Sequence, residues 1–372
     1  MTEIQKDREV MAKEYDAIPN RLFVLQVLLL GVLLAAYQFS GASAALANGL
    51  AEQFGGNLWY VSNAVYTIIS VFGFAACMFP FSYYSGHVLE RHYGLSNETF
   101  GDWFGDFIKS LLIDLVLATI LFSVIYALLR WLPGIWWLSA AIFYILFAVV
   151  LSTIAPVVIM PLFHKFDPIE EGELADAVRG MMEESDIKVV GVYKWGLEEK
   201  TNSANAAFTG IGRTKRIILG DTLLSGYSKE EILAILAHEV GHCKNHDILR
   251  LTFVQSLLAV LGFYVAHLCL SSLVAFYGLG GVDNIGAAPI FIFSLFVFSL
   301  IAMPFTNMHS RQREFAADAY AVQKTGSPDA LVSALEKLAD QNLSNKEPAA
   351  WVELLLHSHP SISRRIERVL QS

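Results

Sequence analysis

Two histidines and a glutamate stand close together in the segment His-Glu-Val-Gly-His, residues 238–242. The surrounding residues 230–246 are mostly good helix formers and include no proline, so we expect a helix there. Positions four apart share one face of a helix, so His238 and His242 can bind the same metal ion. Glu239 could then take a proton from a water molecule at the metal. The spacing therefore predicts a zinc centre that activates water.

A zinc centre of this kind requires at least a third protein ligand and an open position for water. Residues 310–322 read as a helix that places Glu314 and Asp318 four apart on one face. Glu314 is a suitable zinc ligand, and Asp318 could fix the tautomer of a ligand histidine by accepting its outer N–H. Alone, this segment would be an acidic, solvated helix face, and the first motif a helix with surface histidines. Their combination favours a zinc site made of His238, His242 and Glu314.

A third histidine, His246, follows His242 by four residues and is a rival ligand. Three histidines on successive turns would extend about 12 Å along the helix axis, which is too far for one ion. We therefore exclude His246 from the site. Cys243 is expected to point away from the ligands and to pack in the protein. The three cysteines of the chain have no paired spacing, which argues against a disulfide framework or a cysteine zinc site.

Two further parts of the sequence could complete a peptidase site. Residues 215–224 read as a short strand, and residues 202–210 could be an edge strand beside it. An edge strand near a zinc helix can bind an extended peptide by strand addition. Asn205 could then bond to the peptide backbone, although alone it would be a turn residue. His359, which precedes Pro360, could donate to a developing oxyanion or could be an exposed histidine before a helix.

Membrane helices must position these residues, because the composition is too apolar for an ordinary soluble protein. The 372 residues are 55% hydrophobic and 16% charged, with a mean hydropathy of +0.48. The formal net charge is -9 without a basic run, which excludes nucleic acid as an expected partner. Residues 1–21 carry charges of both signs, unlike the lead of a cleavable signal peptide. The apolar run that follows is therefore expected to be a retained membrane helix.

Six apolar stretches reach or approach the length of a bilayer span. They are Leu22–Asn48, Trp59–Tyr84, Ser110–Leu129, Trp131–Phe163, Leu251–Tyr277 and Ala288–Asn307, and the prolines of the fourth are expected to kink its ends. The N-terminal tail, residues 164–250 and the C-terminal region carry Lys and Arg, whereas residues 49–58 and 278–287 have none. The positive-inside bias predicts that both termini and the large loop are cytoplasmic. Inside the spans, Asp114 could be a cavity or an interfacial group, and His267 could be a packing or a functional group.

We divide the chain into four parts. Residues 1–163 hold the tail and the first four membrane helices, and residues 164–250 hold the first part of the zinc domain. Residues 251–308 hold the last two membrane helices, and residues 309–372 hold the second part of the zinc domain with the third ligand. The two soluble parts are short, so we expect them to pack together.

The chain resembles the type I CAAX prenyl proteases, which are integral-membrane zinc metalloproteases of the gluzincin type. The resemblance covers most of residues 84–365 and keeps the family's order, which makes it highly specific. The segments that carry it are GHVLERHYGLSNETFGDWFGDFIK, IAPVVIMPLFHKFDPIEEGEL, NSANAAFTG, KRIILGDTLL, HEVGHCKNH, SRQREFAADA and SHPSISRRI. In familiar members the histidine after the zinc motif comes one residue later than His246, so we carry over no role to it.

The resemblance implies three zinc ligands, a general base and a residue that stabilises the tetrahedral intermediate. It also implies a carboxylate that orients a ligand, a residue that holds the substrate backbone and an arginine near the substrate. In that order, these residues are His238, His242, Glu314, Glu239, His359, Asp318, Asn205 and Arg365.

The implied fold is a mainly α, polytopic membrane protein. A ring of transmembrane helices would surround an intramembrane chamber, capped on the cytoplasmic side by a gluzincin-like zinc protease domain with a small β-sheet. Better-known members have seven spans and a longer first loop, whereas this sequence predicts about six spans and a very short loop. The membrane would be a bacterial inner membrane or the endoplasmic reticulum, and the oligomeric state stays open.

The implied function is removal of the C-terminal tripeptide from prenylated CAAX proteins or peptides, with one zinc ion per chain. The substrate and the lipid bilayer are the expected partners. A membrane quality-control protease that acts on unprenylated substrates is the main alternative. A non-catalytic zinc scaffold is disfavoured because the general base, Glu239, is present.

Overall fold

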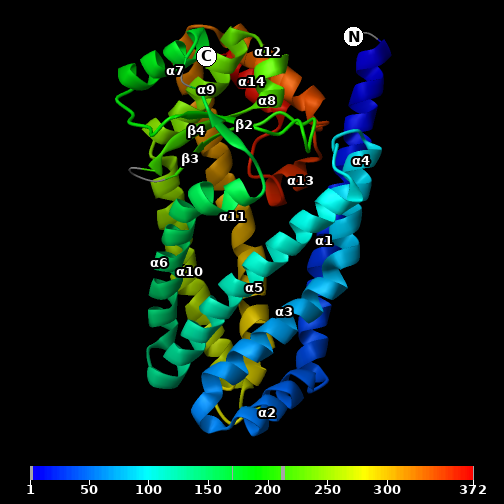
Figure 1. Ribbon diagram of the computed structural model, residues 1–372, viewed down its shortest axis with the longest axis vertical. Coiled ribbons are helices and arrows are strands. Elements are labelled where there is room, and N and C mark those ends of the chain that lie inside the picture. The colour runs from blue at the N-terminus through cyan, green and yellow to red at the C-terminus, as the bar shows by residue number, and fades with distance from the viewer. Residues whose placement is uncertain (1–2, 170, 211–213, 372) are drawn as a thin grey trace.

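The computed structural model describes residues 3–169, 171–210 and 214–371, and for residues 3–7 we describe the backbone alone. Long helices form one part of the molecule, and a small sheet with shorter helices caps one end of them (Figure 1). The long helices are α1 (Glu3–Phe39), α3 (Trp59–Tyr83), α5 (Phe100–Trp131), α6 (Trp136–Ile154), α10 (Asp247–Leu273) and α11 (Ala288–Thr325). Within the described residues, six helical segments are long and apolar enough to cross a membrane. The predicted mainly α fold with six spans is confirmed.

The six long helices surround a cavity of 1180 Å³, and all of them contribute side chains to its wall. The wall is mostly apolar, with scattered amides and hydroxyls such as Gln26 and Gln255. This cavity confirms the expected chamber inside a ring of membrane helices. His267 lies outside its wall and accepts a hydrogen bond from Trp136 Nε1 at 3.0 Å, which fits a packing role. Asp114 is exposed on α5.

The first predicted span is wrong at its C-terminal end. Instead of one helix over residues 22–48, the chain ends α1 at Phe39, turns at Gly41, and begins α2 (Ala42–Phe54). Gly41 has a φ of 75°, a backbone conformation that favours glycine. With 13 residues, α2 is shorter than the roughly 20 residues that cross a bilayer, so it adds no span. It lies at the end of the molecule opposite the sheet (Figure 1).

The remaining spans lie near their predicted places and differ at their ends. Trp131, predicted to start the fourth span, ends α5 instead, and α6 begins at Trp136. After α6, the chain passes through a π-helical turn and a 3₁₀ turn (residues 155–162), where Pro156 and Pro161 remove backbone donors, as expected for a kinked end. Residues 288–307 and 310–322, predicted as a span and a separate helix, form the single helix α11. Our division of the chain at residue 308 therefore falls inside a continuous helix, and the division at 250 falls inside α10.

A four-stranded sheet is the core of the cap, with the strand order β1-β2-β4-β3. Its strands are β1 (Phe166–Pro168), β2 (Val192–Trp195), β3 (Ala206–Thr209) and β4 (Arg216–Gly220), and only β2 and β4 pair in parallel. The small sheet and the edge position of β3 confirm the prediction. The strand predicted over residues 215–224 is wrong after Gly220, because α8 (Asp221–Gly226) begins there. The Asp221 carboxylate accepts the Thr222 N–H at that helix start.

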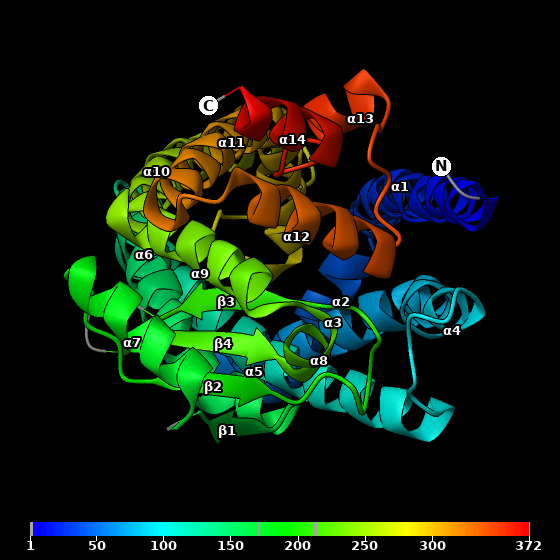
Figure 2. The same cartoon turned by 90° about the horizontal axis from the view of Figure 1, so that it is seen from above.

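Helix α9 (Lys229–Lys244) lies beside β3 and packs against α11 and α12 (Pro328–Gln341) (Figure 2). The two soluble parts therefore pack together, as expected. The remaining helices of the described chain are α4 (Glu90–His92), α7 (Glu173–Glu184), α13 (Ala350–Leu355) and α14 (Ile362–Leu370). Gly241 allows α9 and α11 to approach closely, since a Cβ at this position would lie 3.0 Å from Ala317 Cα.

Candidate active site

A capping box starts helix α9. The Ser228 hydroxyl accepts the Glu231 N–H at 3.3 Å, and the Glu231 carboxylate accepts the Ser228 N–H at 2.8 Å. The same carboxylate accepts hydrogen bonds from Ser333 and Lys337 of α12, at 2.6 and 2.7 Å. These bonds fix both the start of α9 and its place against α12, so they set where His238 lies.

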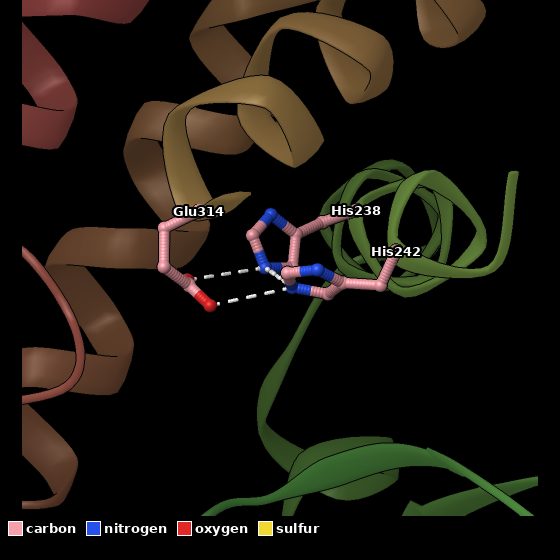
Figure 3. Close-up of side chains that lie close together, drawn as sticks. All are labelled: His238, His242 and Glu314. Carbon is pink, nitrogen blue, oxygen red and sulfur yellow. Dashed lines mark hydrogen bonds and ion pairs between the residues drawn. The ribbon is translucent and has the colours of Figure 1, made fainter. Parts of the chain in front are cut away.

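Three predicted ligands converge between α9 and α11. His238 and His242 point from α9 toward Glu314 of α11 (Figure 3). Their Nε2 atoms are 3.1 Å apart, and the Glu314 oxygens lie 3.5 Å from His238 Nε2 and 3.3 Å from His242 Nε2. A tetrahedral zinc ion with bonds of about 2.05 Å requires ligand atoms about 3.3 Å apart. The donor set and its spacing therefore fit zinc without rearrangement of the helices.

The outer nitrogen of His238 faces a buried carboxylate. Asp318 Oδ1 lies 2.9 Å from His238 Nδ1, one turn beyond Glu314 on α11. Arg365 of α14 donates to both oxygens of Asp318, at 2.7 and 2.9 Å, and its Nη1 lies 3.5 Å from Glu314. The structure thus brings Asp318 to the predicted place and buries Arg365 beside it. Arg365 Nη2 also lies 3.4 Å from His238 Nδ1, so the arginine faces the ligand cluster itself.

The outer nitrogen of His242 faces another carboxylate, which the sequence did not lead us to select. Asp247 Oδ2 lies 3.0 Å from His242 Nδ1, and Asp247 Oδ1 lies 3.6 Å from Arg313. His246 is exposed at the turn between α9 and α10, with a φ of 55°, and it is outside the ligand cluster as predicted. The structural reason differs from the predicted one. We expected a continuous helix to place His246 too far along its axis, whereas α9 ends at Lys244, before His246.

The carboxylates around the two histidines favour positive charge. Burial alone would lower the pKa of His238, but hydrogen bonds to Asp318 and Glu314 outweigh burial and raise the pKa to about 9. Burial opposes charge on His242 as well, yet its bonds to Glu314 and Asp247 raise its pKa. An environment that stabilises an imidazolium also stabilises a divalent cation at the same nitrogens.

Glu239 contacts the edge strand. The Phe208 N–H, which points away from β4, donates to Glu239 Oε2 at 3.2 Å. Earlier on the same segment, the Asn342 side chain accepts the Ala204 N–H at 2.9 Å and donates to the Ala204 carbonyl at 3.0 Å. These bonds fix the peptide directly before Asn205. Sequence reasoning missed Asn342, because nothing in the residues that follow α12 indicates a partner 138 positions away.

His359 reaches the ligands from the loop between α13 and α14. Its Nδ1 lies 3.1 Å from Glu314 Oε1, and 65% of its side chain is exposed. A cavity of 670 Å³ opens here. The site residues in its wall are Asn205, His238, Glu239, Glu314, His359 and Arg365. On another side, Leu331, Leu335 and Leu338 of α12 form an apolar wall. The cavity can therefore take an apolar peptide between the metal ligands and the edge strand.

Two sequence profiles of known protein families together match almost the whole chain. Residues 168–372 match the profile described as Peptidase family M48, and residues 6–165 match the one described as CAAX prenyl protease N-terminal, five membrane helices. The chain is 32% identical over 308 residues to CAAX prenyl protease 1 of Saccharomyces cerevisiae, covering 77% of this chain and 67% of that protein. It is 31% identical over 286 residues to the uncharacterized metalloprotease YhfN of Bacillus subtilis, covering 76% and 67%.

A solved structure agrees over almost the whole chain. The crystal structure of Ste24p from S. mikatae superposes with a TM-score of 0.84 at 25% sequence identity. The match covers 98% of this chain and 88% of the other. The likeness therefore includes both the membrane ring and the cap that carries the metal ligands.

Proposed function

The chain belongs to the type I CAAX prenyl proteases of peptidase family M48, and it is a zinc metalloendopeptidase of the membrane. We propose that it removes the C-terminal tripeptide of prenylated CAAX proteins or peptides. One observation supports a lipid-bearing peptide as the substrate. Helix α11 lines the chamber as far as Thr306 and carries Glu314 eight residues later, about 12 Å further along the axis. A single helix thus joins an apolar membrane space to the cutting site.

When held by His238, His242 and Glu314, zinc would supply the Lewis acidity that lowers the pKa of a water molecule and polarises the scissile carbonyl. Glu239 takes the proton of the attacking water and passes it to the leaving amine. His359 donates a hydrogen bond to the oxyanion of the tetrahedral intermediate. Asn205 holds the substrate backbone, while the outward N–H and C=O groups of β3 pair with the extended peptide.

Pairing of the substrate with β3 would also break the hydrogen bond between Glu239 and the edge strand. In the structure the Phe208 N–H is occupied by Glu239, at 3.2 Å. A peptide that pairs with β3 competes for this donor. Its arrival would release the carboxylate toward the attacking water, so that the base becomes available with the substrate in place.

The experiment is a cleavage assay with the purified, full-length protein and matched farnesylated and unfarnesylated CAAX peptides. Each peptide is tested with and without a zinc chelator, and the released tripeptide is quantified. The proposal expects cleavage of the farnesylated peptide between the modified cysteine and the tripeptide, abolished by the chelator and restored by zinc.

The other outcomes decide against the proposal. Equal cleavage of both peptides would favour a quality-control protease that does not read the prenyl group. Cleavage of neither, by a protein with one zinc ion bound, would favour a non-catalytic scaffold. Glu239→Gln protein is the matched control, because it removes the base and leaves the proposed ligands in place.

A further inference from the structure

Asp247 stands behind His242 in the same way that Asp318 stands behind His238. We propose that Asp247 and Arg313 form a positioning pair that orients His242 toward zinc and ties the metal centre to the membrane helix α10. The inference deepens the proposed function, since it rests on His242 being a zinc ligand. It does not depend on which peptide is cut.

The two ring nitrogens of His242 face different partners. Nε2 lies 3.1 Å from His238 Nε2 and 3.3 Å from Glu314, so it is the nitrogen that can bind the metal. Nδ1 lies 3.0 Å from Asp247 Oδ2. A carboxylate at Nδ1 holds the proton on that nitrogen, leaves the Nε2 lone pair for zinc, and makes the ring a stronger donor. The Asp247 side chain is 9% exposed, so water competes little for this bond.

A local reversal of the chain brings Asp247 to His242. Residues five apart on a continuous helix lie about 140° apart around the axis, so they do not share a face. Here α9 ends at Lys244, and His246 adopts the left-handed region with a φ of 55°. Non-glycine residues are uncommon in this region. The turn starts α10 at Asp247 and directs its carboxylate back to the ligand.

Arg313 completes the pair from a third helix. Its Nη1 lies 3.6 Å from Asp247 Oδ1, an oxygen that is buried and has no hydrogen-bond partner among the described residues. Arg313 directly precedes Glu314 on α11. The arrangement repeats that of Asp318, which receives Arg365 from α14. Both zinc histidines are thus backed by a carboxylate that an arginine partly neutralises.

A purely structural role would have a different signature. An aspartate in the first turn of α10 stabilises the helix start whether or not it touches His242. Asp102 provides the matched control, because it lies in the first turn of the membrane helix α5. Asp247→Asn separates the two roles at one position, since an asparagine oxygen can still accept a hydrogen bond from the Nδ1–H group of His242 while the negative charge is lost.

The test measures zinc affinity of the full-length protein in detergent, by competition with a chromophoric chelator. It is paired with the visible absorption spectrum of the Co²⁺-substituted protein and with thermal unfolding of the metal-free protein. We expect Asp247→Ala to weaken zinc binding about 10- to 100-fold and to alter the cobalt spectrum, with Asp247→Asn recovering most of both. Arg313→Gln should weaken binding by a smaller factor, and Asp102→Ala should leave it unchanged.

Unchanged zinc affinity and an unchanged cobalt spectrum in Asp247→Ala would overturn the proposal. So would a loss of metal-free stability that accounts for the whole effect, or an equal loss in Asp102→Ala. The substrate proposal fails separately: a protein that ignores the prenyl group can still show the predicted order of zinc affinities.

Discussion

Glu239 is the residue that we propose as the general base, because it is an acid on the zinc helix and lies in the wall of the cavity beside the metal ligands. It lies next to His238 in sequence but faces Phe208 of β3. We predict that Glu239→Gln keeps one zinc ion per chain and lowers the peptidase rate roughly 100- to 10,000-fold, since an amide cannot take a proton from water. Metal analysis beside the peptide assay checks this. Near-normal turnover in the variant would contradict the assignment of the base.

His359 is predicted to act on the transition state rather than on the metal. Its side chain is 65% exposed and reaches Glu314 from a loop, so its removal leaves the ligands supported by α9 and α11. His359→Ala should lower kcat roughly 100- to 1000-fold with a small change in KM. Steady-state kinetics and zinc content measured on the same preparation check the prediction. A loss of zinc instead of kcat would show that His359 supports the metal.

The residues of the site were predictable where both members of a pair lie on one helix. His238 and His242 follow from the helical period, and Glu314 and Asp318 follow from a second helix with the same spacing. Asp247 was not predictable in this way, because it reaches His242 only through a left-handed residue that ends one helix and starts the next. Sequence periodicity predicts which residues share a face within one helix. It does not predict the two-residue turn between α9 and α10.

Between elements, the close approach of α9 and α11 decides whether the ligands meet. A Cβ at Gly241 would lie 3.0 Å from Ala317 Cα and 3.2 Å from its carbonyl oxygen. Since backbone atoms cannot move aside alone, Gly241→Ala should separate the helices and weaken zinc binding about tenfold or more. Gly180→Ala in α7 is the matched control, because a Cβ there meets nothing within 4 Å. It should be neutral or slightly stabilising.

Zinc affinity by chelator competition, measured on both glycine variants, tests the approach. Equal affinities for Gly241→Ala and the unmodified protein would show that the helices tolerate the extra methyl group. A loss in Gly180→Ala of the same size would show that the effect is not specific to the contact.

The start of α9 gives a pH-dependent prediction. Burial of Glu231 opposes its ionisation, but hydrogen bonds from Lys337, Ser333 and the Ser228 N–H outweigh burial and lower its pKa. A carboxyl with a lowered folded-state pKa stabilises the protein above its unfolded pKa, about 4.3, and loses this contribution as pH falls through the folded value. Glu231→Gln should therefore destabilise the protein by about 1–3 kcal/mol at pH 7 and by less below about pH 4.

Thermal unfolding of the metal-free proteins at several pH values checks this prediction, because zinc loss in acid then affects neither variant. Glu336, an exposed glutamate of α12, is changed to Gln as the control. A Glu231→Gln effect that stays constant from pH 7 to pH 3 would contradict an ionised, hydrogen-bonded carboxylate.

Element boundaries were less predictable than element types. Hydropathy separates the span at residues 288–307 from the acidic helix at 310–322, although the backbone of α11 continues through both. Strands β1 and β2, with three and four residues, were not predicted at all, since such short segments carry little periodicity. Hydropathy depends on whether lipid, water or protein surrounds a segment. It therefore cannot locate the end of a helix such as α11, which continues from the membrane into the zinc domain.

At the scale of the molecule, the thickness of the bilayer made the number of membrane helices predictable. The ends of these helices and the space between them were not predictable in this way. Each span needs about 20 apolar residues, so six spans could be counted from the sequence. The break at Gly41 could not, because the later part of α1 and the start of α2 are both apolar, and the chain turns between them at Gly41, whose φ is 75°. The chamber of 1180 Å³ was expected from resemblance alone, as no local pattern encodes the space between helices.

The orientation of the whole molecule in the membrane is the last prediction. The start of α1 and the end of α14 lie at the end that carries the sheet, and α2 lies at the opposite end (Figure 1). Residues 49–58 and 278–287 have no Lys or Arg, whereas the sheet end is rich in both, so the zinc domain should be cytoplasmic. The exposed residues Glu52, at the α2 end, and Lys188, in the cap, report the two sides.

Single cysteines at these two positions, in a chain whose three natural cysteines are replaced by serine, make the orientation measurable. In sealed cells or vesicles with the cytoplasmic face inside, a membrane-impermeant maleimide should label Glu52→Cys. It should label Lys188→Cys only after the membrane is permeabilised, and both should react in detergent. Because six spans return the chain to its starting side, the reverse pattern would place the zinc centre on the outer side of the membrane, away from the cytoplasmic prenylated proteins that we propose as substrates.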